Sequence, residues 1–267
     1  MRVWGAAILL CLAACHRQAP EPTFDGGDYT TAAQKIAHGK RLADVLDCTG
    51  CHGPGQQGKD MADKPEDGAM YSPNITLLLP AYSDAELDRL IRHGVPKDGR
   101  EFWYMQAECY QFLSDRDLAA IIAFMRSFKP AGKVLPPFRF NRVEQQDVDD
   151  GEEGDAQVQI AKFRDHQPID LGPQHAWGRY LVKTTCTGCH NNALQGWKNF
   201  TPNLDIAGAY SKEELTHLLL TGEGKSKKNL GMMSDMVRRH LTQLTPGERE
   251  AIVDYVLARA NRPQSAN

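Results

Sequence analysis

Two five-residue stretches of identical sequence, CTGCH, carry the side chains best suited to chemistry in this chain. They run from Cys48 to His52 and from Cys186 to His190. Two cysteines three residues apart lie on one helical turn, where their sulfur atoms can add to the two vinyl groups on one edge of a porphyrin. The histidine that follows is then placed to offer a ring nitrogen to the iron. The pair of motifs predicts two covalently attached haem c groups, held by Cys48, Cys51, His52, Cys186, Cys189 and His190.

Zinc binding and thiol redox chemistry are the other known uses of such motifs. Structural zinc needs four ligands, and no second C-x-x-C or H-x-x-x-H lies within reach of either copy. A thioredoxin-like dithiol needs a strand-helix-strand context, and neither half shows a convincing alternating strand pattern. Haem attachment is the interpretation that fits both copies.

The sequence around the two motifs repeats in the same order. Each motif is preceded by a helix-like pattern that contains a glycine, Gly39 or Gly178. Each is followed by a Ser/Thr-Pro-Asn element, a middle helix and a last helix. Such repetition indicates two copies of one unit of roughly 90 to 100 residues, whose thin core would be centred on the apolar porphyrin. We expect each unit to fold poorly without haem.

Capping residues predict where the later helices of each unit begin and end. The middle helices begin with the spacing of a capping box and end at a glycine. The last helices begin at Ser114 and Thr245, the second with a proline at its first position. The middle helices have capping boxes at Ser83 with Glu86 and at Ser211 with Glu214, and end at Gly94 and Gly222.

These features predict an all-α protein with two tandem helical domains joined by an acidic linker. The linker carries seven acids and no base between Glu144 and Asp155. Such a run stays in solvent, and an acidic docking patch for a basic partner is the alternative. The predicted parts are a signal peptide (1–14), a tether (15–28), domain 1 (29–132), the linker (133–173), domain 2 (174–262) and a tail (263–267).

The first fifteen residues have the features of an export signal. An early Arg2 precedes an apolar stretch that is too short to span a bilayer as a permanent helix. Its end, Leu12 to Cys15, resembles the lipobox of bacterial lipoproteins, in which Cys15 becomes the lipidated first residue. An ordinary export signal is the alternative. The predicted location is the bacterial periplasm, with a lipid anchor to a membrane.

The charge balance excludes one class of partner. The chain has 31 Lys and Arg against 34 Asp and Glu, a net charge of −3. Nothing in this balance favours binding to nucleic acid.

With both motifs and the repeat in view, each half resembles a class I cytochrome c domain. The tandem resembles dihaem cytochromes c and the cytochrome subunits of membrane-associated alcohol and related dehydrogenases. The long acidic linker and the lack of a third cytochrome unit depart from those subunits. The resemblance implies that the first and last helices of each domain cross near a glycine and an aromatic residue. The matching positions are Gly39 with Phe124 and Gly178 with Tyr255.

A methionine is expected as the second axial ligand in each domain, because this ligand closes the iron to substrates and raises its potential. In domain 1, Met125 belongs to the last helix and is expected in the core, while Met61 and Met70 come too early. Met105 lies in the loop where the resemblance places the ligand.

In domain 2 the register selects one of three methionines. Met233 follows Met105 by 128 residues, the offset that also relates Ser211 to Ser83. Met236 is the alternative. Three histidines are fallback ligands but are expected in solvent beside charged helix surfaces, namely His93, His217 and His240.

Further residues are expected around the two haems. Pro73 and Pro202 are expected to orient His52 and His190, with a plain turn as the alternative. The asparagines that follow them, Asn74 and Asn203, are available to hydrogen-bond a haem propionate. Cys109 is expected to be a buried free thiol. An exposed lysine cluster could steer an acidic redox partner and comprises Lys225, Lys227 and Lys228.

The predicted function is an electron carrier with no small-molecule substrate and no catalytic residues. It would take electrons from a redox protein, either a dehydrogenase or a quinol-oxidising complex, and pass them to a downstream acceptor protein. The alternatives are a dihaem enzyme of peroxidase type, which needs an open iron position, and a haem-bearing subunit of a larger respiratory complex.

Overall fold

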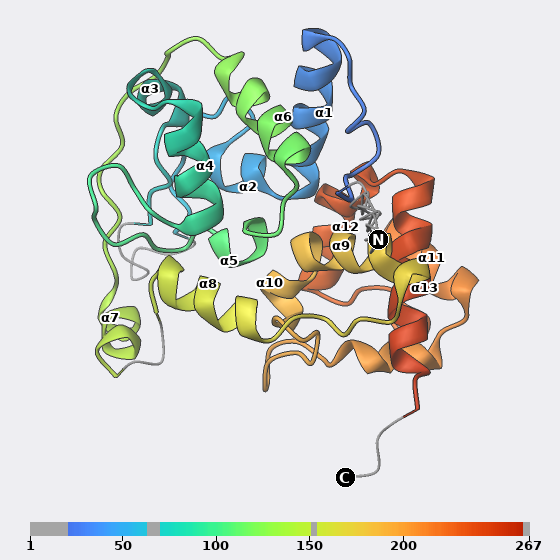
Figure 1. The fold of residues 1–267 in the computed structure, drawn as a ribbon. Helices are drawn as coiled ribbons and strands as arrows, with labels where there is room; N and C mark the ends of the chain where they lie inside the picture. The colour runs from blue at the N-terminus through green and yellow to red at the C-terminus, as the bar shows by residue number, and fades with distance from the viewer. Residues whose placement is uncertain (1–20, 63–69, 151–153, 264–267) are drawn as a thin grey trace, which may run out of the picture.

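The structure is a computed structural model that describes residues 21–62, 70–150 and 154–263 (Figure 1). The predicted signal peptide and Cys15 lie outside these residues. Within them the fold is all helical, as predicted, and the only β pairing is two isolated bridges, Asp60 with Tyr71 and Trp197 with Thr201. None of the described helices is both long and apolar enough to cross a membrane.

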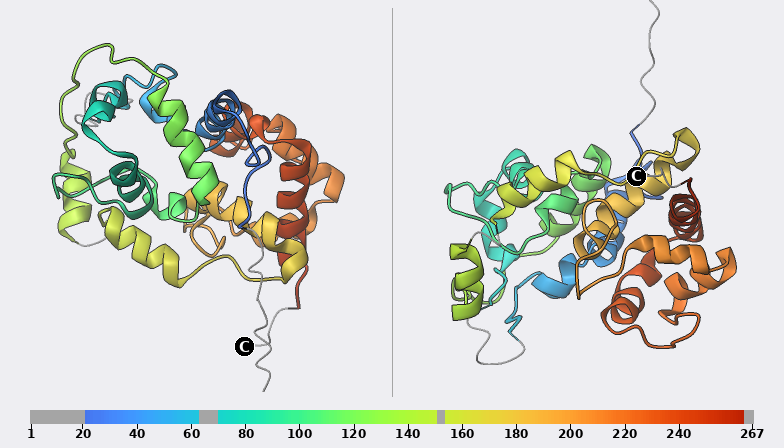
Figure 2. Two further views of the ribbon diagram at one scale, coloured as in Figure 1. Left: turned by 45° about the horizontal axis from the view of Figure 1, so that its top comes forward. Right: turned by 90° about the horizontal axis from the view of Figure 1, so that it is seen from below.

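In the part of the chain that the structure describes, domain 1 has six α-helices and domain 2 has five, with two more between them. Figures 1 and 2 show the two groups of helices side by side, with α1, α6 and α5 of domain 1 facing domain 2. The helices of domain 1 are α1 (Ala32–Val45), α2 (Cys48–His52), α3 (Ile75–Leu78), α4 (Asp84–His93), α5 (Ala107–Tyr110) and α6 (Asp115–Arg126). Then come α7 (Arg142–Asp149) and α8 (Ala156–Asp165). Domain 2 has α9 (Ala176–Thr185), α10 (Thr187–His190), α11 (Lys212–Thr221), α12 (Met232–Arg239) and α13 (Pro246–Ala260), with short 3₁₀ turns at Pro173–His175, Leu204–Ala209 and Leu241–Gln243.

The predicted caps set the ends of the later helices. The capping boxes form at the starts of α4 and α11, and both helices end at a left-handed glycine, Gly94 or Gly222. Thr245 caps α13 in the same way, and Ser114 caps α6 through its side chain. Each cap satisfies backbone N–H groups that the first turn of a helix leaves without partners.

The first and last helices of each domain cross at the predicted glycines. A Cβ atom on Gly39 would lie 1.9 Å from the carbonyl oxygen of Ala120 in α6. A Cβ atom on Gly178 would lie 2.2 Å from that of Ala251 in α13 and 2.8 Å from the Cβ atom of Tyr255. No larger residue fits at either crossing, so the glycines allow the helix backbones to touch.

The segment between the domains is not solvated throughout, which corrects part of the prediction. Helix α7 carries no buried residue, in line with its acidic sequence. Helix α8, however, buries Ala156, Ile160 and Phe163 and packs on α5. These apolar residues lie at helical spacing after the acidic run, so together they form the buried face of a helix. The many acidic residues nearby led to the prediction of a solvated linker instead.

The end of the predicted tether is also packed rather than free. Phe24 has no exposed surface and lies edge-on to Tyr180, with ring centroids 5.7 Å apart. The indole N–H of Trp177 donates to the carbonyl of Thr23 (2.8 Å), and the backbone N–H of Asp25 donates to Glu248 (2.8 Å). Residues 21–28 therefore belong to the contact between the domains. The prediction that residues 15–28 form a tether is wrong for this part of the chain.

Buried polar groups connect the two domains. The carboxylate of Asp117 in α6 lies 2.7 Å from Nε2 of His38 and accepts hydrogen bonds from the hydroxyl of Tyr180 (2.6 Å) and the N–H of Phe24 (2.9 Å). Arg41 of α1 forms a two-pronged ion pair with the buried Glu248 of α13, with both distances 2.8 Å. These contacts fix the domains against one another.

Candidate haem-binding sites

The two CTGCH motifs form short helices that hold their cysteines as protonated thiols. Burial raises the pKa of Cys48 to about 12 and that of Cys186 to about 11, and it also raises the pKa of Cys51 and Cys189. A redox-active dithiol needs a thiol whose pKa is lowered instead. The environment of all four sulfurs thus argues against thioredoxin-like chemistry.

Both motif histidines are held by the same hydrogen bond. Nδ1 of His52 donates to the carbonyl of Pro73 (3.2 Å), and Nδ1 of His190 donates to the carbonyl of Pro202 (2.9 Å). Burial lowers the pKa of both histidines, which favours the neutral ring. A neutral ring that donates through Nδ1 presents the lone pair of Nε2, as an iron ligand must. The prolines therefore act through their carbonyl oxygens.

One hydroxyl residue in each domain, Ser72 or Thr201, connects the segment of the proline to its motif. Neither residue is assigned a role in the sequence analysis. The Ser72 hydroxyl donates to the carbonyl of Cys51, and the Thr201 hydroxyl donates to that of Cys189, both at 2.5 Å. A glycine with positive φ, Gly58 or Gly196, donates its N–H to the carbonyl of the motif histidine. The signal was present in the repeated Ser/Thr-Pro-Asn element, in which only the last two residues received roles.

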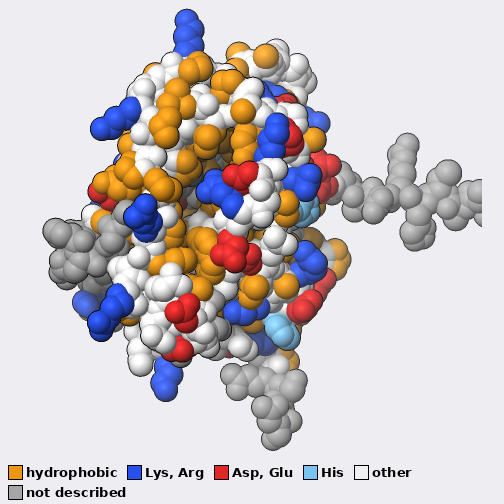
Figure 3. Space-filling view, turned by 90° about the vertical axis from the view of Figure 1, so that its left-hand side faces the viewer, with side chains coloured by type: hydrophobic (Ala, Val, Ile, Leu, Met, Phe, Trp, Pro, Cys, Tyr) orange, Lys and Arg blue, Asp and Glu red, His pale blue; other side chains and the backbone are white. Residues whose placement is uncertain are grey.

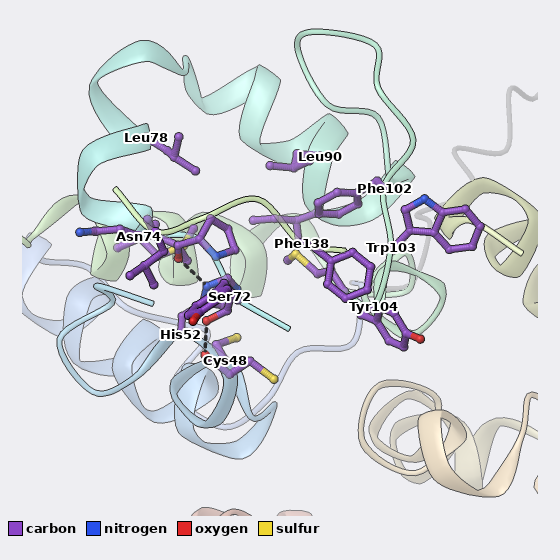
Figure 4. Close-up of a pocket in the computed structure, with 18 of the residues that line it drawn as sticks. Cys48, His52, Ser72, Asn74, Leu78, Leu90, Phe102, Trp103, Tyr104 and Phe138 are labelled. Carbon is purple, nitrogen blue, oxygen red and sulfur yellow. Dashed lines mark hydrogen bonds between the residues drawn. The ribbon is translucent and has the colours of Figure 1, made fainter. Parts of the chain in front are cut away.

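An apolar cavity of about 600 Å³ lies against the first motif. Figure 4 shows Cys48 and His52 at one wall and Leu78 and Leu90 across from them, and Figure 3 shows the hollow among hydrophobic side chains. Its size is within the range of about 300 to 1,000 Å³ that small-molecule and cofactor sites occupy. A large apolar ring attached at the cysteines and the histidine fits this space.

Met105 and part of the segment between the domains also line the cavity. Val134 and Phe138 line the cavity together with Trp103 and Tyr104, the residues just before Met105. The ring of Phe138 lies 5.0 Å from that of Tyr104 and 4.9 Å from that of Phe140, which in turn lies 4.9 Å from Trp103. The methionine loop and the segment after α6 thus cover this cavity together.

In domain 2 the candidate methionines lie on α12. Met233 is half-buried and packs against the hydrophobic core, whereas Met232 is 55% exposed. Met236 lies about one turn further along α12 and is also half-buried. The contact with the core favours Met233.

Comparison with known proteins agrees with this geometry. The model of the cytochrome c family matches residues 36–129 and 176–259, which together make up more than half of the chain. The chain belongs to the cytochrome c family. The matched segments contain both CTGCH motifs, both prolines and both candidate methionines.

Relatives of these cytochrome c domains are subunits of dehydrogenases, which confirms the predicted resemblance. The chain is 26% identical over 266 residues to the gluconate 2-dehydrogenase cytochrome c subunit of Pantoea cypripedii, over 83% of this chain and 58% of that protein. It is 31% identical over 140 residues to the alcohol dehydrogenase (quinone) cytochrome c subunits of Gluconacetobacter polyoxogenes and Komagataeibacter europaeus, over 50% of this chain and 29% of theirs. This cytochrome therefore spans between 29% and 58% of the length of these relatives.

The asparagines of the cytochrome c domains serve the fold. The Asn74 amide donates to the carbonyls of Ala131 (2.8 Å) and Lys133 (3.1 Å), and its oxygen accepts from Thr76 (2.8 Å). Its side chain is therefore bonded within the protein, and a contact with a propionate stays a prediction. The Asn203 oxygen caps the 3₁₀ turn at Leu204–Ala209, so turn formation explains it as well.

The fallback histidines divide between solvent and the domain contact. The side chains of His93 and His217 are 56% and 55% exposed, as expected. His240 is buried instead, because Nδ1 donates to the carbonyl of Asp44 (2.9 Å) and Nε2 lies 3.1 Å from the carboxylate of Asp47. The solvated position expected for His240 is wrong, since it belongs to the contact between the domains.

Proposed function

We propose that this chain is a dihaem c-type cytochrome that carries electrons between proteins at the outer face of the cytoplasmic membrane. The observation that carries the proposal is the double set of neutral histidines, each with Nδ1 bonded to a proline carbonyl and each in a matched cytochrome c domain. Haem c would supply the one-electron iron couple at each site.

The residues of this chain have distinct parts in that function. Cys48 with Cys51, and Cys186 with Cys189, would attach one haem each. The bonded Nδ1 of His52 and His190 keeps Nε2 directed at the iron, while Met105 and Met233 would complete the axial ligands. A thioether ligand on both irons leaves no open position for a substrate. With these ligands in place, the two sites would favour electron transfer over peroxidase chemistry.

The donor and acceptor would be redox proteins. The named relatives are cytochrome subunits of a gluconate dehydrogenase and of quinone-dependent alcohol dehydrogenases, so we propose a dehydrogenase or a quinol-oxidising complex as the donor. Near domain 2, Lys225 is engaged with Glu214 (2.9 Å), whereas Lys227 and Lys228 are exposed and can steer an acidic partner. Lipidation at Cys15 would anchor the protein to a membrane on its periplasmic side.

The proposal is tested on the purified protein. The haem content per chain, measured by the pyridine haemochrome assay, is expected to be two, and a redox titration is expected to show two reversible one-electron steps with low-spin spectra. A single haem, or a high-spin iron that reacts rapidly with peroxide, would overturn the proposal and favour the enzyme.

A further inference from the structure

The two haem-attachment helices are linked through elements that follow or contain the candidate methionines. Helix α5 begins two residues after Met105 and contacts both α9 and α10 of the other domain (Figure 1). In the reverse direction, His240 ends α12, the helix of Met233, and binds Asp44 and Asp47 just before the first motif. Each methionine element therefore touches the CTGCH region of the opposite domain.

A direct contact between the domains at the second motif joins Cys109 and Thr187. Thr187 is the second residue of the second CTGCH, and its hydroxyl oxygen lies 3.3 Å from the sulfur of Cys109. The same hydroxyl oxygen lies 2.6 Å from the carbonyl oxygen of Lys183, so Thr187 connects the Cys109 sulfur of domain 1 to the backbone of α9 in domain 2. Cys109 is 1% exposed and Thr187 has no exposed surface, so water does not enter this contact.

Tyr110, the neighbour of Cys109, completes a route to the first site. Its ring lines the cavity against the first motif, and its hydroxyl donates to the carbonyl of Leu46 (2.8 Å), two residues before Cys48. Tyr110 is 7% exposed. From the first cavity to the second motif the path thus consists of one aromatic ring, one peptide unit and one contact of 3.3 Å.

A second close approach lies beside the first. A Cβ atom on Gly188, the third residue of the second motif, would lie 3.1 Å from the side chain of Gln106, the neighbour of Met105. The glycine therefore lets the backbone of the second attachment helix approach the methionine loop of the first domain. His240 holds the opposite side of the contact, where it spans α12 and the residues before α2.

We propose that electrons pass directly between the two haem sites through the path formed by Tyr110, Cys109 and Thr187. With haem at both sites, one electron would pass along these residues from the reduced site to the oxidised site, and no atom would be transferred. The inference rests on the proposed function, because both sites must hold haem that cycles between these states. Cys109 and Thr187 act as positioning and coupling residues and His240 keeps the contact in register.

The repeat supplies a matched control for testing this path. Thr49 occupies the same place in the first CTGCH as Thr187 in the second, but its hydroxyl donates within its own domain, to Asp44 (3.0 Å). Thr187→Val and Cys109→Ala each interrupt the cross-domain contact with little change in volume. Thr49→Val makes the same chemical change away from it.

The experiment measures electron exchange between the haems in half-reduced protein that carries both haems, from the haem-methyl proton resonances. In the unchanged protein we expect an exchange rate that is independent of protein concentration. Thr187→Val and Cys109→Ala are expected to slow it severalfold while both midpoint potentials stay the same, and Thr49→Val to leave it unchanged. A rate proportional to concentration, or an equal effect of Thr49→Val and Thr187→Val, would overturn the path.

The same sample separates this inference from the proposed function. If the haems cannot be reduced and reoxidised reversibly, the electron-carrier proposal fails. If both haems cycle but Thr187→Val and Cys109→Ala exchange electrons at the rate of the unchanged protein, only the path through Cys109 and Thr187 fails.

Discussion

The two haem sites share their histidine side and differ on their methionine side. The hydrogen bond from histidine to proline and the hydroxyl bond to the second cysteine occur in both. On the other side, Met105 precedes α5 in a loop covered by residues 134–138, whereas Met233 lies within α12. The attachment geometry is therefore kept in both copies, while each domain builds its own cover. Differences in potential between the sites are expected to arise on the methionine side.

Removing the cysteine pair of one motif should make the two haem sites differ most strongly, because it removes the covalent haem from one domain only. Cys48→Ala with Cys51→Ala should leave one covalent haem and unfold domain 1, because an apolar cavity of about 600 Å³ would lose its occupant. Cys186→Ala with Cys189→Ala should likewise leave one haem. Haemochrome content and thermal unfolding followed by circular dichroism test both variants. A protein without any haem that still unfolds cooperatively would contradict the role of haem in the core.

The first comparison also shows what the sequence could predict. Local signals such as the capping box at Ser83 were sufficient for the helix starts, because neighbouring residues decide caps, whereas the crossing at Gly39 was implied by the resemblance to the family. The motif spacing likewise predicts the attachment residues. Both domains repeat these signals, so each copy supports the other.

The contact between the domains could not be predicted in the same way. Phe24 and His240 stand in polar surroundings in the sequence, and their burial depends on surfaces more than 90 residues away in the chain. Asn74 had the right place for a propionate but meets backbone carbonyls that only the fold brings to it. Such long-range burial leaves no periodic signal in the sequence.

Substitution of each candidate methionine by alanine should have the next largest effect, because it changes the axial ligand of one haem at a time. Met105→Ala and Met233→Ala should each remove about half of the near-infrared charge-transfer band of sulfur-ligated ferric haem and lower the potential of one haem. The matched controls are Met61→Ala, in the same cavity as Met105, and Met236→Ala, on the same helix as Met233. A band that survives in Met233→Ala and is lost in Met236→Ala would reassign the second ligand.

Substitution of Glu248 should show whether the two domains unfold together, because Glu248 pairs with Arg41 across the contact between them. Glu248→Ala leaves Arg41 without its buried partner and should lower the free energy of unfolding by about 3 kcal/mol, since such a change leaves a largely buried charge uncompensated. Glu214→Ala is the control, because Glu214 occupies the same capping-box position in α11 but is paired at the surface. Denaturation by urea, followed at the absorbance of both haems, measures the loss. Equal losses in the two variants would show that only the cap matters.

Lys183 should produce the smallest effect, and it distinguishes the helices that precede the two motifs. No lysine lies between Leu42 and Cys48 in domain 1, but Lys183 lies three residues before Cys186. Burial lowers the pKa of Lys183 from 10.5 to about 8, so the folded protein holds its proton less tightly than the unfolded chain. Its contribution to stability is therefore unfavourable below pH 8 and is relieved as the pH rises from 8 to 10.5.

Lys183→Met is accordingly expected to be more stable than the unchanged protein at pH 7, by up to about 1 kcal/mol, because solvent screens part of the charge. The advantage should shrink as the pH rises to 10.5, since the unchanged protein then loses the penalty. Lys40→Met in α1, where the lysine side chain is 65% exposed, is the matched control at a solvent-exposed position. Free energies of unfolding at a series of pH values measure both variants. If the difference for Lys183→Met does not change with pH, the desolvation of Lys183 does not set its protonation, and α9 resembles α1, the helix before the first motif, in this respect.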